Sequence, residues 1–216
     1  MQQVYTVGHS SQSIEEFIAS LHRHAIEVVA DVRSRPYSRR FPHFSREALQ
    51  ATLKAADIGY VFLGRELGAR RDEPQCYVDD QARYDRIAKL PGFADGIKRV
   101  LDGAREYRVA LMCAEQDPLT CHRTILVCRE LTPHGVSITH IHRGGMLEPH
   151  QQAEQRLVAE ELGAVDPGDL FATAEDAPER LEQAYRNRAL AIAYRRGNSA
   201  ESAAKSAAKH PPQTRA

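Results

Sequence analysis

Short apolar runs alternate with amphipathic segments along most of the chain, and this alternation limits the fold more than any other sequence feature. The segments between the runs carry apolar residues at helical spacing. Strands that alternate with helices favour an α/β fold, so we predict a mainly parallel five-stranded sheet flanked by helices. The predicted strands are residues 4–7, 27–32, 58–63, 107–113 and 136–141.

Start signals in the sequence place helices between these strands. Ser13 and Glu16 have the spacing of a capping box, ahead of an apolar stripe. A helix is predicted at 91–106, because it opens on a proline, which suits the first helical position. Another is predicted at 121–131. The charged stretch 64–83 is predicted to be a long loop, and loops of that length are often functional.

Composition divides the chain of 216 residues into three parts. We assign residues 1–145 to the α/β domain. Residues 146–194 form an acidic helical extension, with helices predicted at 151–162 and 179–194. Residues 195–216 are rich in Ala, Ser, Lys and Pro and cannot bury enough apolar surface to offset their ordering entropy, so we expect a disordered basic tail.

Charge and composition exclude several classes of protein. The chain has 29 basic and 29 acidic residues, and no stretch approaches the roughly 18 apolar residues that a membrane span needs. The N-terminus lacks the features of a secretory signal, so we expect a cytoplasmic protein with no membrane partner. In that compartment the cysteines would be buried thiols, metal ligands or reactive groups rather than disulfides. These cysteines are Cys76, Cys113, Cys121 and Cys128.

Polar side chains follow each predicted strand, at the edge where open parallel sheets bind ligands. After the first two strands come His9, Ser10, Asp31, Arg33, Arg35 and Ser38. After the fourth come the segments CAE at 113–115 and CHR at 121–123, and after the fifth come His140 and His142. If the sheet is parallel, these groups share one edge. Walker A, G-x-G-x-x-G, H-E-x-x-H and G-x-S-x-G motifs do not occur.

Five ordered segments carry a resemblance to a known family. They are VGHS at 7–10, DVRSRPYS at 31–38, FLGRELG at 62–68, LMCAEQDPLTCHR at 111–123 and HI at 140–141. Over residues 4–142 the chain resembles the domain-of-unknown-function 488 family. The resemblance implies an α/β domain but little about activity, because the family was named for lacking an assigned one. The shared polar positions it implies are His9, Ser10, Asp31, Arg33, Pro36, Cys113, Glu115, Cys121, His122 and Arg123.

The segment 113–123 allows three chemical interpretations. In the first interpretation Cys113 is a nucleophile, and His122, Arg123 and a helix amino end favour its thiolate form. Alternatively, Cys113, Cys121 and His122, with His9, bind zinc or iron, although seven residues between the cysteines exceed the usual spacing. In the third interpretation the cysteines are small buried hydrophobic residues, which is the role we expect for Cys128.

Two carboxylates offer acid-base chemistry. Asp31 and Glu115 end or follow apolar strands, so either is a candidate for proton transfer, with His9 or Arg33 setting its charge. The alternative for Asp31 is an internal salt bridge with an arginine such as Arg33. A solvated or capping role is expected for His140 and His142.

The loop 33–46 contains five arginines, three aromatic residues and no acid. It is a candidate either for a phosphate clamp or for a nucleic-acid surface. The alternative is a solvated loop with Tyr37, Phe41 and Phe44 folded onto the core. A sequence pI near 7.2 favours the local anion site over an extended groove.

These observations predict an enzyme that acts on a small anionic substrate, phosphorylated or nucleotide-like; a nucleic-acid-binding protein without turnover is the alternative. The cofactor and the oligomeric state stay unknown, and no residue is assigned to a metal. The candidate catalytic residues are Cys113, Glu115, Asp31, His9 and His122. The candidate substrate-binding residues are Ser10, Arg33, Arg35, Ser38 and Arg123.

Overall fold

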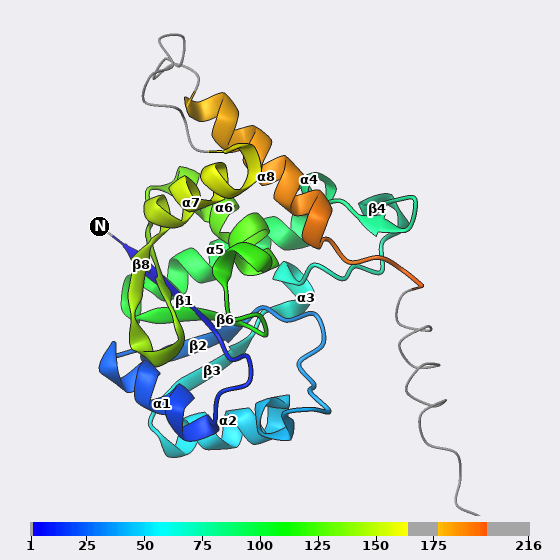
Figure 1. Cartoon of the computed structure of the whole chain (residues 1–216). Helices are drawn as coiled ribbons and strands as arrows, with labels where there is room; N and C mark the ends of the chain where they lie inside the picture. The colour runs from blue at the N-terminus through cyan, green and yellow to red at the C-terminus, as the bar shows by residue number, and fades with distance from the viewer. Residues whose placement is uncertain (1, 164–176, 198–216) are drawn as a thin grey trace, which may run out of the picture.

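A six-stranded sheet runs through the centre of the computed structural model, which describes residues 2–163 and 177–197 (Figure 1). All neighbouring strands are parallel except the last pair, in which β8 is antiparallel to β7. The predicted α/β class with a mainly parallel sheet is confirmed. The sheet has one strand more than predicted, because β8 is three residues long and shows no readable alternation. In spatial order the strands are β3 (Gly59–Phe62), β2 (Val28–Asp31), β6 (Val109–Cys113), β1 (Gln3–Gly8), β7 (Ser137–Ile141) and β8 (Leu147–Pro149).

Helices cover both faces of the sheet, and the alternation of side chains along β6 explains why. Ala110 and Met112 belong to the apolar core under α1 (Ile14–Arg23) and α2 (Arg46–Ala55). Leu111 belongs to the larger core on the opposite face. That face is covered by α5 (Pro91–Glu106), the π-helix η4 (Arg123–Cys128) and α6 (Arg129–Leu131).

The helix start signals are confirmed where local chemistry defines them. The Ser13 side chain accepts from the Glu16 N–H at 3.1 Å, and the Glu16 carboxylate accepts from the Ser13 N–H at 3.0 Å. Helix α5 has the predicted bounds. The helix predicted at 121–131 starts later and begins as the π-helix η4, a form that hydrophobic periodicity does not distinguish from an α-helix.

The stretch 64–83 is not the long loop that its charge predicts. It contains α3 (Gly64–Leu67), the 3-10 turn η2 (Pro74–Cys76) and a hairpin of β4 (Tyr77–Val78) and β5 (Gln81–Ala82), and α4 (Tyr84–Ile87) follows directly. The few apolar side chains of the stretch are buried in the larger core, which holds these short elements in place. They include Leu67, Ala69, Cys76, Tyr77 and Ala82.

Both predicted C-terminal helices are present, as α7 (His150–Leu162) and α8 (Ala177–Ile192). Their buried residues Leu157 and Tyr185 join the same core as η4, and α8 packs against α7 and η4. Arg195 then bridges to Gln81 of the hairpin. The disordered tail is predicted at 195–216, but its first residues are ordered, since the Arg196 N–H donates to the Asp80 carbonyl at 2.8 Å. Residues 198–216 lie outside the described residues. None of the described helices has the length and apolar character that a membrane span requires.

Candidate active site

The strand connections open a crevice at the carboxyl ends of β1 and β6. Gly8 pairs with Cys113 in the sheet register, so the two strands end side by side. From there the chain turns to α1 on one face after β1 and to η4 on the opposite face after β6. This divergence is the usual position of ligand sites in open α/β sheets. A cavity of about 490 Å³ lies at this point.

Seven of the ten predicted site residues line this cavity, and three do not. Those that line it are His9, Arg33, Arg35, Ser38, Cys113, Glu115 and His122. The three outside it are Ser10, Asp31 and Arg123. The parallel sheet therefore gathers residues that follow β1, β2 and β6, as the sequence predicts. It does not bring the residues after β7 to the same cavity.

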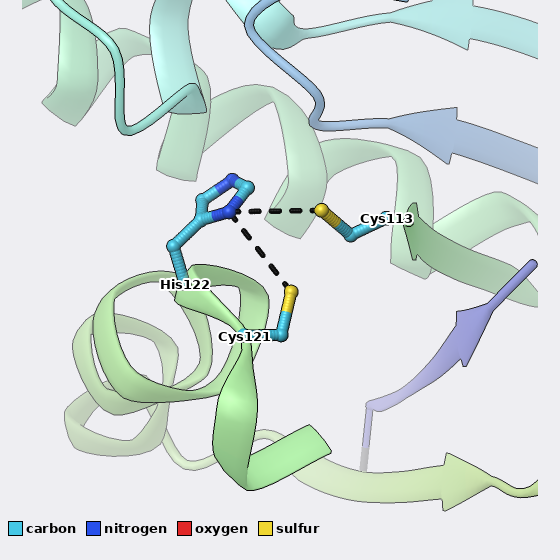
Figure 2. A group of neighbouring side chains, drawn as sticks. All are labelled: Cys113, Cys121 and His122. Carbon is cyan, nitrogen blue, oxygen red and sulfur yellow. Dashed lines mark hydrogen bonds between the residues drawn. The ribbon is translucent and has the colours of Figure 1, made fainter. Parts of the chain in front are cut away.

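Two thiols, a carboxyl and an imidazole form a cluster at one side of the cavity, which Cys113, Glu115 and His122 line and Cys121 does not. The Sγ atoms of Cys113 and Cys121 donate to the same oxygen of Glu115, at 3.1 and 3.0 Å. The Nδ1 atom of His122 lies 3.6 Å from the Cys113 sulfur and 4.0 Å from the Cys121 sulfur (Figure 2). All four residues come from the segment 113–122. This segment leaves the end of β6 and folds back on itself before η4 begins.

Backbone contacts fix the orientation of His122. Its Nε2 atom lies 3.1 Å from the carbonyl oxygen of Val32, which follows β2. A carbonyl only accepts, so Nε2 carries a hydrogen, and in the neutral ring the lone pair of Nδ1 points at the two sulfurs. The neighbouring strand thus determines which nitrogen faces the cluster.

Burial changes the protonation chemistry of the cluster. It raises the pKa of Glu115. The hydrogen bond with Cys121 and burial raise the pKa of Cys113. Burial opposes ionisation of Cys121 as well, but the Cys113 thiol and the charge of Arg123 lower the pKa of Cys121. The sequence interpretation gives the thiolate to Cys113, whereas these contacts favour it on Cys121.

Arg123 holds the backbone of the cluster rather than facing the cavity. Its side chain is almost completely buried, and its guanidinium donates to the carbonyls of Glu115 and Gln116 at 2.6 and 3.0 Å. A third contact reaches the hydroxyl of Thr6 at 3.4 Å. These contacts use three of the five guanidinium donors, and the residue does not line the cavity where the sequence interpretation places a substrate anion. Arg123 therefore shapes the turn that carries Glu115.

Gly8 is required where that turn crosses the end of β1. A Cβ atom at this position would lie 1.8 Å from the carbonyl oxygen of Glu115. This distance is far inside van der Waals contact, so only glycine allows the turn to approach the strand.

Asp31 anchors Arg33 and does not itself reach the cavity. Its carboxylate accepts from Nε and Nη2 of Arg33 at 2.9 and 2.7 Å and from the Tyr60 hydroxyl at 2.8 Å. Side-chain exposure is 0% for Asp31 and 6% for Arg33. This arrangement is the internal salt bridge considered for Asp31, and it orients a guanidinium toward the cavity wall.

His9 is a neutral neighbour of Arg33. Its Nδ1 donates to the carbonyl of Ser10 at 3.0 Å, and its Nε2 accepts from Arg33 at 3.2 Å. Burial and the charge of Arg33 lower the pKa of His9 to about 4. The ring stacks on Phe44 with centroids 4.2 Å apart, so His9 is a fixed acceptor that positions Arg33.

The basic loop after β2 forms the mouth of the cavity. Ser38 lines it while its hydroxyl accepts from the Phe41 N–H at 3.0 Å, which turns the loop. Phe44 is fully buried and Phe41 packs against the same core, as expected for these two residues if the loop aromatics fold onto the core. Tyr37 is 70% exposed and remains at the mouth. Ser10 instead forms part of the turn after β1, where its N–H donates to the Ala114 carbonyl at 2.8 Å.

Among the cavity residues that sequence reasoning missed, three carry polar or aromatic groups and come from irregular or distant segments. Arg70 follows α3, Tyr84 begins α4, and Tyr194 follows α8. Arg70 stacks over the Tyr194 ring at 4.7 Å, so the C-terminal extension helps to close the site. No motif marks these residues, and only the packing of α8 brings Tyr194 to the sheet edge.

His140 is not solvated, contrary to the expectation from its place at a strand end. It is 1% exposed and lies between the Thr6 hydroxyl at 2.8 Å and the Nδ1 atom of His150 at 3.0 Å. Helix α7 covers it, a packing that the strand pattern alone does not reveal. His142 is half-buried and pairs with Glu148 at 2.7 Å.

A family model described as domain of unknown function DUF488 matches residues 13–129, more than half of the chain. The matched range is shorter than the region of resemblance at 4–142 and leaves out the segments VGHS and HI. It includes the cysteine cluster, the Asp31–Arg33 pair and the basic loop. No match was found among curated proteins or among solved structures.

Proposed function

The chain belongs to the DUF488 family, a domain of unknown function, and from its site we propose that it is an enzyme acting on a small anionic substrate, phosphorylated or nucleotide-like. One observation carries the proposal. Among the residues that the structure describes, four arginines and one carboxyl group, that of Glu115, line the cavity. They are Arg33, Arg35, Arg39 and Arg70. An excess of guanidinium groups around one acid suits the binding of a phosphate-type anion.

Arg33 supplies a preorganised donor for such an anion. Of the five N–H donors of a guanidinium, two bind Asp31 and one binds His9. Two donors have no partner among the described residues. Because the ion pair with Asp31 fixes the side chain, substrate binding would not have to order it. The exposed Arg35 adds a second charge at the mouth.

Glu115 is the proposed proton-transfer group. Its Oε2 atom is held by two thiols, and Oε1 has no hydrogen-bond partner among the described residues. A carboxyl group that is held in place and faces a substrate cavity meets the geometric requirement for a general acid or base. Asp31 does not meet it, because both of its oxygens are bonded to Arg33 or Tyr60.

Aromatic side chains at the mouth support the nucleotide-like part of the proposal. Tyr37 is largely exposed and Tyr194 presents a ring stacked on Arg70. Flat aromatic and guanidinium surfaces of this kind stack on nucleobases. The role of Cys113 as a nucleophile stays a prediction. Its sulfur lines the cavity, but its hydrogen is donated to Glu115.

A turnover assay tests this proposal. The full chain is incubated with a panel of nucleoside phosphates and sugar phosphates, and products are detected by mass spectrometry. For any substrate found, Glu115→Gln is expected to lower turnover by about 100-fold or more while binding is kept. Glu106→Gln, at the exposed end of α5, serves as the matched control and keeps full activity. Equal turnover by wild type and Glu115→Gln would remove Glu115 from the mechanism.

A further inference from the structure

We propose that Cys113, Cys121 and His122 bind one transition-metal ion of the zinc type. Cys113 and Cys121 are buried and His122 is half-buried, and their ligand atoms lie within 4.8 Å of one another (Figure 2). The site borders the cavity of the proposed function and shares Glu115 with it. The metal site is argued from sulfur and imidazole donors, whereas the anion site is argued from the arginines.

The spacing of the donor atoms fits a tetrahedral ion. Zinc–sulfur and zinc–nitrogen bonds of roughly 2.3 and 2.0 Å place sulfur and nitrogen ligands about 3.5 Å apart at a tetrahedral angle. The Nδ1 atom of His122 lies 3.6 Å from one sulfur and 4.0 Å from the other. Shifts of a few tenths of an ångström would therefore complete the ligation.

The imidazole is already oriented for ligation. The hydrogen bond from Nε2 to the Val32 carbonyl leaves the Nδ1 lone pair directed at the sulfurs. Metal-binding histidines commonly donate their second ring nitrogen to a carbonyl or carboxylate, which fixes the ring and its tautomer. Here that partner comes from the end of a different strand, β2, so the orientation does not depend on the flexibility of the ligand segment.

Backbone and charge also suit a metal-bound thiolate at Cys121. The N–H of Arg123 points at its sulfur at 3.4 Å, and the buried guanidinium of Arg123 lies behind the cluster. Two thiolates would balance the charge of a divalent ion, and the remaining charges of Glu115 and Arg123 are opposite. A bound ion thus allows both sulfurs to be ionised without leaving an uncompensated buried charge.

Three donors leave one position of a tetrahedral ion for a further ligand, and two of them, Cys113 and His122, line the cavity. Glu115 Oε2 lies 3.1 and 3.0 Å from the sulfurs, closer than the roughly 3.6 Å expected between two ligands of one zinc ion. We therefore assign three protein ligands, with the fourth position open to water or a substrate oxygen and Glu115 beside it. Three protein ligands and one open position are typical of catalytic rather than structural zinc. The donor set of two sulfurs and one nitrogen disfavours magnesium and calcium.

The long spacing between the cysteines has a structural reason. Cys113 ends β6, whereas Cys121 and His122 directly precede η4. Between them lies the turn whose carbonyls accept hydrogen bonds from the Arg123 guanidinium. The ligands are thus brought together by the fold of the sheet edge and not by a short local motif. The site is therefore difficult to recognise from sequence spacing alone.

Metal content and spectroscopy of the full chain test the proposal. The reduced protein is loaded with zinc chloride, freed of excess ion and analysed for zinc, and separately loaded with cobalt(II). We expect one zinc per chain and a cobalt spectrum with sulfur-to-metal charge transfer and tetrahedral bands. Cys121→Ser and His122→Ala should each weaken zinc binding by about 100-fold. Cys128→Ser, a buried thiol of η4 outside the cluster, should bind like wild type.

Alkylation of the wild-type protein gives a test that needs no variant to fold. Zinc should protect Cys113 and Cys121 from alkylation, and a chelator should remove that protection without affecting Cys76 and Cys128. Rapid alkylation of Cys113 with zinc present, or no zinc retained, overturns the proposal; fast reaction without zinc dependence would identify a nucleophile instead. Inorganic phosphate binding by chelated protein is measured in parallel. It tests the arginine site separately, so the two proposals can fail independently.

Discussion

Arg33 is held by Asp31 through a two-point ion pair, with N···O distances of 2.9 and 2.7 Å, where β2 reaches the edge of the sheet. Tyr60 of the neighbouring strand β3 donates to the same carboxylate at 2.8 Å. The pair is almost completely removed from solvent. Arg33 is therefore a fixed cation, and its direction toward the cavity is set by the sheet rather than by the loop that follows.

Asp31→Asn is expected to destabilise the fold. The substitution leaves the Arg33 guanidinium buried without a counter-charge, and breaking a buried ion pair from one side costs about 3–5 kcal/mol. The free energy of unfolding measured in urea should fall by this amount. Asp85→Asn, in an exposed pair with Arg83 at 3.4 Å, is the matched control and should leave it unchanged. Equal stability of the two variants would show that the Asp31–Arg33 pair does not hold the sheet edge.

The buried pair of His140 and His150 predicts sensitivity to acid. Burial, followed by the charges of His150 and Arg123, lowers the pKa of His140 well below its ordinary value of 6.5. The unfolded chain binds this proton more readily, so the contribution to stability is present above about pH 6.5 and is lost as the pH falls toward the folded pKa. Glu154 faces His150 across the Tyr185 hydroxyl and opposes the decrease in the pKa of His150.

Urea unfolding at about pH 8 and about pH 5 measures this linkage. The difference in unfolding free energy between the two conditions should be smaller for His140→Gln than for wild type. The control, His134→Gln, alters an exposed histidine and should keep the wild-type difference. An unchanged difference in His140→Gln would mean that another group dominates acid unfolding.

Gly8→Ala tests the contact between β1 and the turn that carries Glu115. The added methyl group would lie 1.8 Å from the Glu115 carbonyl, so the turn has to move away from the strand. We expect a loss of stability of about 3 kcal/mol and a loss of zinc retention together, because the turn links Cys113 to Cys121. Gly92→Ala adds the same methyl group at a position with no atom within 4 Å. It should change neither property appreciably.

Much of the site edge could be predicted because it follows from local patterns. The apolar run before Cys113 identifies a central strand, and parallel strands bring the residues after them to one edge. His9, Arg33 and Glu115 therefore converge as expected. The role of Arg123 could not be predicted in this way, since its partners are oxygens of three residues that approach only in the folded chain.

Longer-range packing explains the other differences between expectation and structure. Tyr194 reaches the cavity because α8 packs across η4, and helical periodicity gives no direction for such packing. His140 is buried because α7 brings His150 over the strand end. Strand β8 was missed because its three residues include Pro149 and too few positions for an alternating pattern.

Nucleic-acid binding is the alternative function, and the exposed arginines of the basic loop test it. Arg39 and Arg40 are exposed, and Arg40 lies over the Phe41 ring at 5.3 Å. The alternative predicts binding to single-stranded DNA or RNA that weakens with added salt and with Arg39→Ala/Arg40→Ala. Fluorescence anisotropy with labelled oligonucleotides measures both effects. No binding at low salt would exclude the alternative.

The central claim is that the arginine-lined cavity is an anion site. Calorimetric titration with inorganic pyrophosphate tests this claim most directly. We predict saturable binding that Arg35→Ala weakens by about tenfold or more, because a charge-assisted hydrogen bond contributes roughly 1.5–3 kcal/mol. Arg105→Ala removes an exposed arginine of α5 far from the cavity lining and should leave the affinity unchanged. No binding by wild type, or equal weakening by both substitutions, would contradict the account.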